Sequence, residues 1–176
     1  MSTTQTILGK VKKDERYKTF KKIVEQVQGR VDFESNRNEA QSLHSGLIVR
    51  TLYGKKQFSP KTIIESVAQV QSNRSRLVEL RSKSQIHLSY LDEASEAFKR
   101  YLMTQYADDL AGFRTKDQRD ALLDRIMAKA QELMAEGKSL HALLDGYIKD
   151  LDQAGYTHKA LVDLLQMLEA KGSQIM

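Results

Sequence analysis

The 176-residue chain contains no cysteine and no tryptophan, and its only proline is Pro60. The absence of cysteine excludes a disulfide framework, a zinc–thiolate site and thiol catalysis. No apolar run approaches the roughly 18–20 residues of a membrane span, and residues 1–18 lack the apolar core of a signal peptide. We therefore expect a protein that binds no membrane and works in the cytoplasm, or in a host cytoplasm or virion if it is viral.

Glycine and proline are both absent from residues 61–111, directly after Pro60. Proline suits the first position of a helix, and Ser59 before it can cap the first turn. Apolar residues then recur every seventh position, with Ser84 as the one exception: Ile63, Val70, Leu77, Leu91 and Phe98. Because a spacing of seven returns to nearly the same helix face, this run predicts one long helix with a packed seam.

A second seam follows Ser139, with apolar positions three and four residues apart. Its members are Leu140, Leu144, Tyr147, Leu151, Ala154, His158, Leu161, Leu165 and Leu168. The unbroken register predicts one helix over residues 140–171, although Gly146 and Gly155 lie inside it. Thr115 can cap a separate, shorter helix, which we expect to end at Gly137.

The N-terminal third predicts shorter helices. One covers residues 10–28 and ends at Gly29, with an apolar face made by Tyr17, Phe20, Val24 and Val27. A capping box of Asn36 and Glu39 predicts a second helix over residues 37–53. The β-branched and aromatic residues of 47–53 favour a strand as the alternative.

These elements predict an all-α protein. A basic helical head would occupy residues 1–58. Residues 59–176 would form a coiled-coil-like hairpin or a three-helix antiparallel bundle, with turns near Gly112 and Gly137. An elongated bundle covers less of its own surface than a globule, so we expect this body to form homo-oligomers or to bind a partner. The side chains expected to line that contact are Ile63, Val70, Leu77, Leu91, Phe98, Leu144, Leu151, Leu161 and Leu165.

Charge is divided unevenly along the chain. Residues 1–90 carry 17 basic and 8 acidic side chains, whereas residues 91–176 carry 11 basic and 15 acidic ones. A basic half favours a polyanionic partner such as DNA or RNA, because each cation that neutralises a phosphate releases a counterion. The candidate nucleic-acid-binding residues are Lys12, Lys13, Lys18, Lys21, Lys22, Lys55, Lys56, Arg74, Arg76 and Arg81.

Each basic cluster also has a structural interpretation. The lysines of residues 10–22 can form the solvated face of an amphipathic helix. The arginines between 74 and 81 can form ion pairs with the acidic second half. A helix-turn-helix built from residues 37–53 and the helix after Pro60 matches poorly, because its turn is longer than the usual 3–4 residues.

Catalytic signatures are weak. His141 and Asp145 are four residues apart, which is the spacing of a dyad on one helix face. Asp117, Asp120 and Asp124 line another face, and a cluster of carboxylates suggests a two-metal site. Neither set belongs to a recognised metal motif, and no glycine-rich phosphate loop is present. His158 lies in the apolar seam, where a buried histidine with a satisfied hydrogen bond is common. We expect no enzyme and no cofactor, with a metal-dependent helical enzyme as a minor alternative.

A small basic head on a coiled-coil hairpin is similar in architecture to the small terminase subunits of tailed phages. Those subunits assemble as rings and hold viral DNA for packaging, so the similarity implies a nucleoprotein assembly. It rests on architecture and assigns no site residues. The main alternative is a helical scaffold, adaptor or inhibitor that binds a protein partner through its helix faces and no nucleic acid.

Overall fold

The computed structural model describes residues 3–48 and 59–172, and every element in these ranges is an α-helix. The three helices at the N-terminus are α1 (Thr3–Lys13), α2 (Glu15–Arg30) and α3 (Phe33–Ser45). Two long helices follow, α5 (Pro60–Gln105) and α7 (Lys116–Gly172), with the five-residue α6 (Ala107–Ala111) between them. The predicted all-α class is confirmed.

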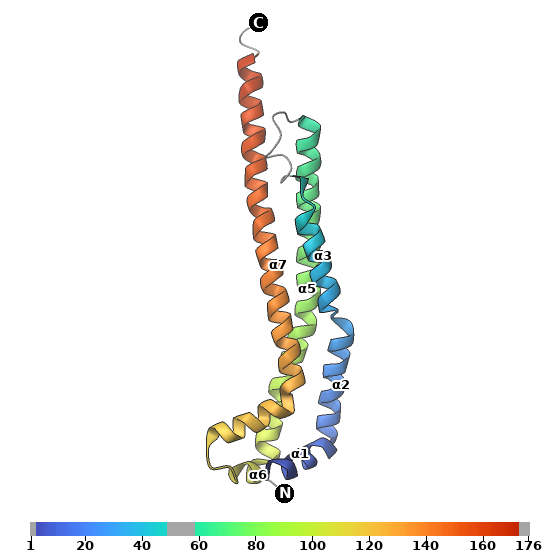
Figure 1. Cartoon of the computed structure of the whole chain (residues 1–176), viewed down its shortest axis with the longest axis vertical. Helices are drawn as coiled ribbons and strands as arrows, with labels where there is room; N and C mark the ends of the chain where they lie inside the picture. Colours follow the sequence, from blue (N-terminus) through green and yellow to red (C-terminus); the bar gives the residue numbers. More distant parts are fainter. Residues whose placement is uncertain (1–2, 49–58, 173–176) are drawn as a thin grey trace. The chain divides into compact units, whose positions relative to one another are not determined.

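The two long helices pack antiparallel (Figure 1). Residue numbers rise along α5 while those of the contacting residues fall along α7. The contacting pairs are Ser66 with His158, Arg74 with Asp152, and Arg81 with Asp145. The part of the first predicted seam that precedes residue 82 therefore faces the second seam inside one chain, in the contact between its own helices.

The chain divides into two compact units, and the division crosses both long helices. Unit 1 contains Met1–Phe33 and Lys83–Ser139, and unit 2 contains Glu34–Ser82 and Leu140–Met176. Unit 1 packs α1 and α2 on its parts of the long helices, with Val11, Phe20 and Leu91 buried. Unit 2 packs α3 in the same way, with Ala40 and Leu144 completely buried. The head was predicted to end at residue 58. Residues 49–58 are not among the described residues, so this boundary stays a prediction.

Local signals in the sequence set the starts of both long helices. The backbone amide of Thr62 donates to Ser59 Oγ at 3.1 Å, and that of Gln118 donates to Thr115 Oγ1 at 3.3 Å. Both caps were predicted. Each satisfies an amide that the first turn of a helix leaves without a partner.

Two predicted boundaries near the N-terminus are wrong. The helix expected over residues 10–28 is two helices, because Asp14 ends α1 and caps α2 by accepting from the amide of Arg16 at 2.8 Å. The expected cap Asn36 lies inside α3, which begins at Phe33. Most of the segment 47–53, for which helix and strand were both considered, lies outside the described residues.

The predicted turn at Gly137 is also wrong, because α7 passes through this position without a break. Gly137 is buried, and a Cβ atom built on it would overlap the side chain of Leu88 on α5. Glycine is therefore needed here for close helix packing and does not act as a C-terminal cap. The helices expected over residues 115–136 and 140–171 are one element, so the body is a hairpin of two long helices.

Candidate nucleic-acid interface

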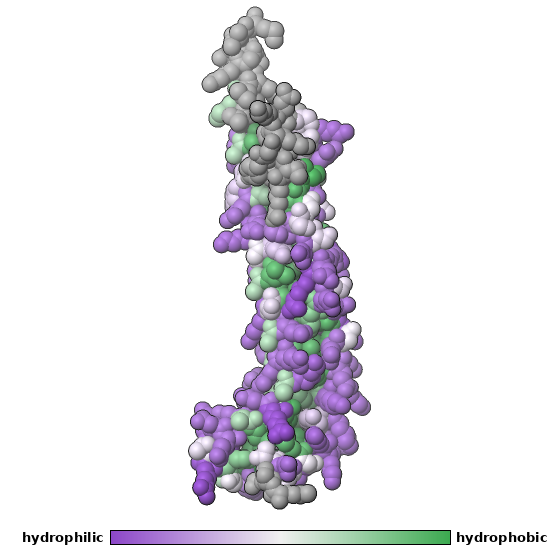
Figure 2. Space-filling model, in the orientation of Figure 1, coloured by the Kyte–Doolittle hydropathy of each residue, from purple (hydrophilic) through white to green (hydrophobic). Residues whose placement is uncertain are grey.

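The five candidate lysines of the N-terminus lie on the last turn of α1 and the first two turns of α2. All five are exposed, and we call them the lysine face: Lys12, Lys13, Lys18, Lys21 and Lys22. Residues 3–30 carry eight basic and three acidic side chains. This excess of basic side chains makes the surface of α1 and α2 cationic. On the molecular face drawn in Figure 2, hydrophilic residues cover most of the surface.

The lysine face is held in place by Asp14, which receives two long-range hydrogen bonds within unit 1. The hydroxyl groups of Tyr101 and Tyr106 donate to its carboxylate at 2.7 and 2.8 Å. Partial burial opposes ionisation of Asp14, but the bonds from both tyrosines and from the amides of Arg16 and Tyr17 outweigh it and lower its pKa. Burial and the bond to Asp14 raise the pKa of Tyr106 to about 12. This carboxylate fixes the junction of α1 and α2 against the end of α5.

The lysine face is only partly neutralised by nearby carboxylates. Lys18 pairs with Glu15 at 2.6 Å and Lys21 with Glu25 at 3.4 Å, both on the helix surface. Exposed pairs of this kind contribute little and are screened by salt. Lys12, Lys13 and Lys22 lie in ion-pair distance of no carboxylate within the described ranges. The cations available to an external anion are therefore mainly these three.

The candidate arginines of α5 form ion pairs within unit 2. Arg74 and Arg81 reach across to Asp152 and Asp145 of α7. The hydrogen bond to Asp152 is the main cause of a raised pKa at Arg74. These contacts agree with the structural interpretation, in which this cluster pairs with the acidic second half.

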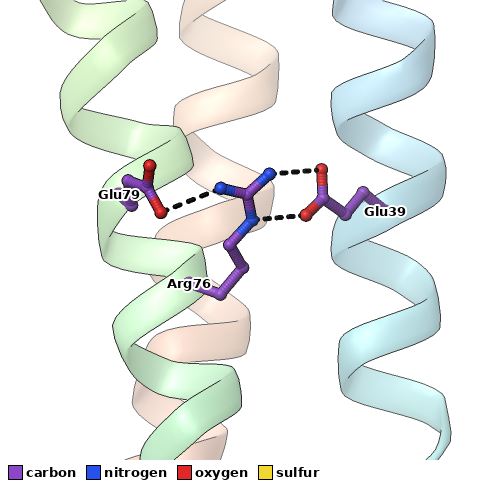
Figure 3. Close-up of polar contacts among 3 residues, drawn as sticks. All are labelled: Glu39, Arg76 and Glu79. Carbon is purple, nitrogen blue, oxygen red and sulfur yellow. Dashed lines mark hydrogen bonds and ion pairs between the residues drawn. The ribbon is translucent and has the colours of Figure 1, made fainter.

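Arg76 joins α5 to α3 (Figure 3). Its guanidinium donates two hydrogen bonds to the carboxylate of Glu39 and a third to Glu79, one turn along α5. The bonds to Glu39 are the first cause of a raised Arg76 pKa. A phosphate would have to replace a bidentate carboxylate here. Lys55 and Lys56, the other predicted pair, lie outside the described residues.

The residues predicted to form an oligomer or partner seam lie in the core of the single chain. Seven of them are at most 5% exposed: Ile63, Val70, Leu77, Leu91, Phe98, Leu144 and Leu151. Leu161 is half-buried, and the side chain of Leu165 lies outside the description. A partner helix could reach the buried seven only by displacing the chain's own helices.

The histidine candidates do not form a catalytic arrangement in the part of the chain that is described. His158 Nε2 lies 2.8 Å from Ser66 Oγ, and both side chains are buried, so no substrate has access to the pair. His158 Nδ1 has no hydrogen-bond partner in the structure as described. Burial lowers the pKa of His158. The pair connects α5 and α7 inside the core, as the sequence predicted for a buried histidine.

The predicted dyad of His141 and Asp145 lies beside Arg81. Burial and the charge of Arg81 lower the pKa of His141, and only Asp145 opposes them. The carboxylate of Asp145 binds Arg81. Asp117, Asp120 and Asp124 are exposed, and no group of three potential metal ligands occurs within residues 3–48 and 59–172.

An apolar groove lies between α2 and α5 in unit 1. It has a volume of about 300 Å³, and the residues that line it include the stacked pair Phe20 and Phe98, with ring centroids 4.5 Å apart. Arg16 also lines the groove, and its guanidinium lies 4.6 Å from the ring centroid of Tyr101. The predicted seam residue Phe98 therefore lines a groove, although its side chain is largely buried.

No protein-family model matches the chain, and neither a curated protein nor a solved structure matches it. Among the described residues, none of the helices is both long enough and apolar enough to cross a membrane.

Proposed function

We propose that this is a non-enzymatic helical protein that binds nucleic acid through the lysine face of α1 and α2. One observation carries the proposal: Lys12, Lys13 and Lys22 are exposed and lie in ion-pair distance of no described carboxylate. A cation without a protein partner gives up no ion pair when it binds phosphate. Arg74, Arg76 and Arg81 would each have to give one up, so we assign them no contact with nucleic acid.

A structural role for these lysines is the competing explanation. Lys12 and Lys13 lie in the last turn of α1, where a cation stabilises the helix dipole. That effect extends only over the last turn, so it does not account for Lys22 in the middle of α2. The two roles are also compatible, since a helix-dipole interaction leaves the ammonium group in solvent.

The test replaces Lys12, Lys13 and Lys22 with glutamine and measures binding to a labelled duplex by fluorescence anisotropy over a range of salt concentrations. The matched control replaces Lys138, Lys149 and Lys159, which are also exposed and removed from the lysine face in sequence. Each lost phosphate contact should lower the slope of log affinity against log salt by about 0.9. We expect the first variant to lose slope and affinity and the control to retain both.

Equal losses in the two variants would mean that net charge alone attracts the duplex, and the lysine face would have no special role. If the unaltered protein fails to bind duplex and single strands at low salt, the proposal is wrong.

Self-association and a role in viral DNA packaging are predictions of the sequence that follow from architecture. The burial of the seam within one chain gives them no added support. The molar mass in solution, measured with and without nucleic acid at two salt concentrations, tests self-association directly.

A second candidate function, protein binding, is favoured by the apolar groove between α2 and α5. The occupant we propose is an amphipathic helix with an acidic flank, because most residues that line the groove are apolar and Arg16 is the one charged residue among them. Ala97 lines the groove and is exposed, so Ala97→Arg should block it without disturbing the core. A designed leucine–glutamate helix should bind the unaltered protein and not this variant. A leucine–lysine helix that bound equally well would contradict the charge argument.

A further inference from the structure

Two neighbouring cavities lie between α1 and α7 in unit 1. The larger has a volume of about 730 Å³ and includes Phe113 and Arg114 of the turn before α7. The smaller, of about 160 Å³, includes Lys12 of α1 and Tyr17 of α2. Arg125 of α7 lines both. We call the combined surface the α1–α7 groove.

One face of α1 forms a continuous wall of this groove. Thr4 lines the larger cavity, and Leu8 and Lys12 line the smaller one. These three residues are four apart, so they lie one above another on a helix. The groove therefore follows α1 along its length and reaches the lysine face at Lys12.

The charged residues that line the groove are all basic: Lys12, Arg114 and Arg125. None of the three forms an ion pair within the described ranges. The acidic residues of the same part of α7 are Asp117, Asp120 and Asp124, and they line neither cavity. Three cations along one groove that lack an ion-pair partner among the described residues are suited to successive phosphates of a strand.

An aromatic side chain accompanies the cations in each cavity. Phe113 and Tyr17 are both half-buried, which leaves part of each ring exposed. The ring of Tyr17 also contacts that of Phe98, with centroids 6.0 Å apart. Proteins hold single strands with cations that contact the phosphates and with aromatic rings on which the bases stack, because every base has a face that can stack.

We propose that the α1–α7 groove binds single-stranded nucleic acid, with phosphates on Lys12, Arg114 and Arg125 and bases against Phe113 and Tyr17. The proposal rests on the proposed function and narrows it from nucleic acid in general to an unpaired strand. Paired bases of a duplex are stacked on each other and cannot reach the rings, so a duplex would contact the lysine face alone.

The test compares an oligothymidylate of about 12 nucleotides, a length within the range of known single-strand sites, with a duplex of equal length. Both are labelled and measured by fluorescence anisotropy. The double variant Arg114→Gln/Arg125→Gln should lower the salt slope for the single strand by about 1.4, from about 0.7 for each contact. It should change duplex affinity less than about two-fold, by the effect of net charge alone. Phe113→Leu retains the bulk of the side chain and removes its aromatic face, and it should weaken single-strand binding at least about five-fold.

The matched control is Lys116→Gln/Arg119→Gln. It removes the same charge from the first turn of α7, between Arg114 and Arg125 in the sequence, at exposed residues that line neither cavity. It should change single-strand affinity less than two-fold, by roughly the effect of net charge alone. All variants alter side chains on the surface or at its edge, so the urea midpoint serves as a check that each has folded.

The outcomes separate the two proposals. If the unaltered protein binds both probes and the groove variants match their control, the groove is not the site, although the proposed function stands. Equal losses for duplex and single strand would contradict strand selectivity. Full displacement of the strand by thymidine monophosphate, but not by inorganic phosphate at equal ionic strength, would identify a mononucleotide site and overturn the inference. If neither probe binds, both proposals fail.

Discussion

Three glycines in the interior of α7, Gly137, Gly146 and Gly155, should respond to alanine in two opposite ways. At Gly146 and Gly155 no atom lies within 4 Å of the position that a Cβ atom would take, so a methyl group meets open space. At Gly137 the same methyl group would overlap the side chain of Leu88. The same substitution should therefore raise the free energy of unfolding at Gly146 and Gly155 and lower it at Gly137. The difference depends on whether a side chain of α5 lies beside the glycine.

The magnitudes follow from helix propensity and packing. Alanine is favoured over glycine in a helix interior by about 1 kcal/mol, so Gly146→Ala and Gly155→Ala should each stabilise the fold by that amount. Gly137→Ala gains the same propensity, but an extra methyl in a packed core costs about 1–3 kcal/mol. Its net effect is therefore a loss of about 0–2 kcal/mol, and it should differ from Gly146→Ala by about 1–3 kcal/mol.

Urea unfolding measures these free energies, and an unchanged m-value would show that the change lies in the stability of the native state. A double-mutant cycle tests the cause. In a Leu88→Ala background the obstructing side chain is gone, so Gly137→Ala should become stabilising. If Gly137→Ala stabilises the otherwise unaltered protein as much as Gly146→Ala does, the close approach of α7 to α5 is refuted.

Local patterns in the sequence were sufficient to predict the long helix after Pro60 and the starts of both long helices. The seam after Pro60 and the caps at Ser59 and Thr115 involve residues a few positions apart, and each was found from spacing alone. Gly137 could not be predicted in this way. A glycine that ends a helix and a glycine that admits a neighbouring helix have the same local signature, and only the opposite residue, Leu88, distinguishes them.

The candidate site was predictable to a smaller extent for the same reason. The exposure of the lysine face followed from amphipathic spacing. The hydrogen bonds that Asp14 accepts from Tyr101 and Tyr106 could not be predicted. These tyrosines lie 87 and 92 residues further along the chain, and only the tertiary fold brings them to Asp14. Arg114 and Arg125 were overlooked beside an acidic stripe on the same helix. Their place next to α1 is a consequence of tertiary packing.

The remaining predictions concern two polar contacts, one partly buried at Asp14 and one buried at His158. Asp14→Ala should lower the free energy of unfolding by about 1 kcal/mol or more, because the cap of α2 is lost and two tyrosine hydroxyls lose their acceptor. Since the pKa of Asp14 is lowered in the fold, its contribution to stability is present above the unfolded pKa of 3.8 and disappears as pH falls through the folded pKa. Acid titration of Asp14→Asn should lack that step. At His158 burial lowers the pKa below 6.5, so the unfolded state binds the proton first as pH falls. Stability should therefore decline below about pH 6.5, by at most about 1.4 kcal/mol per pH unit for this one proton. His158→Gln should show a shallower decline in urea unfolding at several pH values, with a residual slope from His141, whose pKa burial also lowers. Identical slopes in the variant and the unaltered protein would mean that His158 keeps its ordinary affinity for protons in the fold, and a neutral imidazole bonded to Ser66 would no longer explain the buried pair.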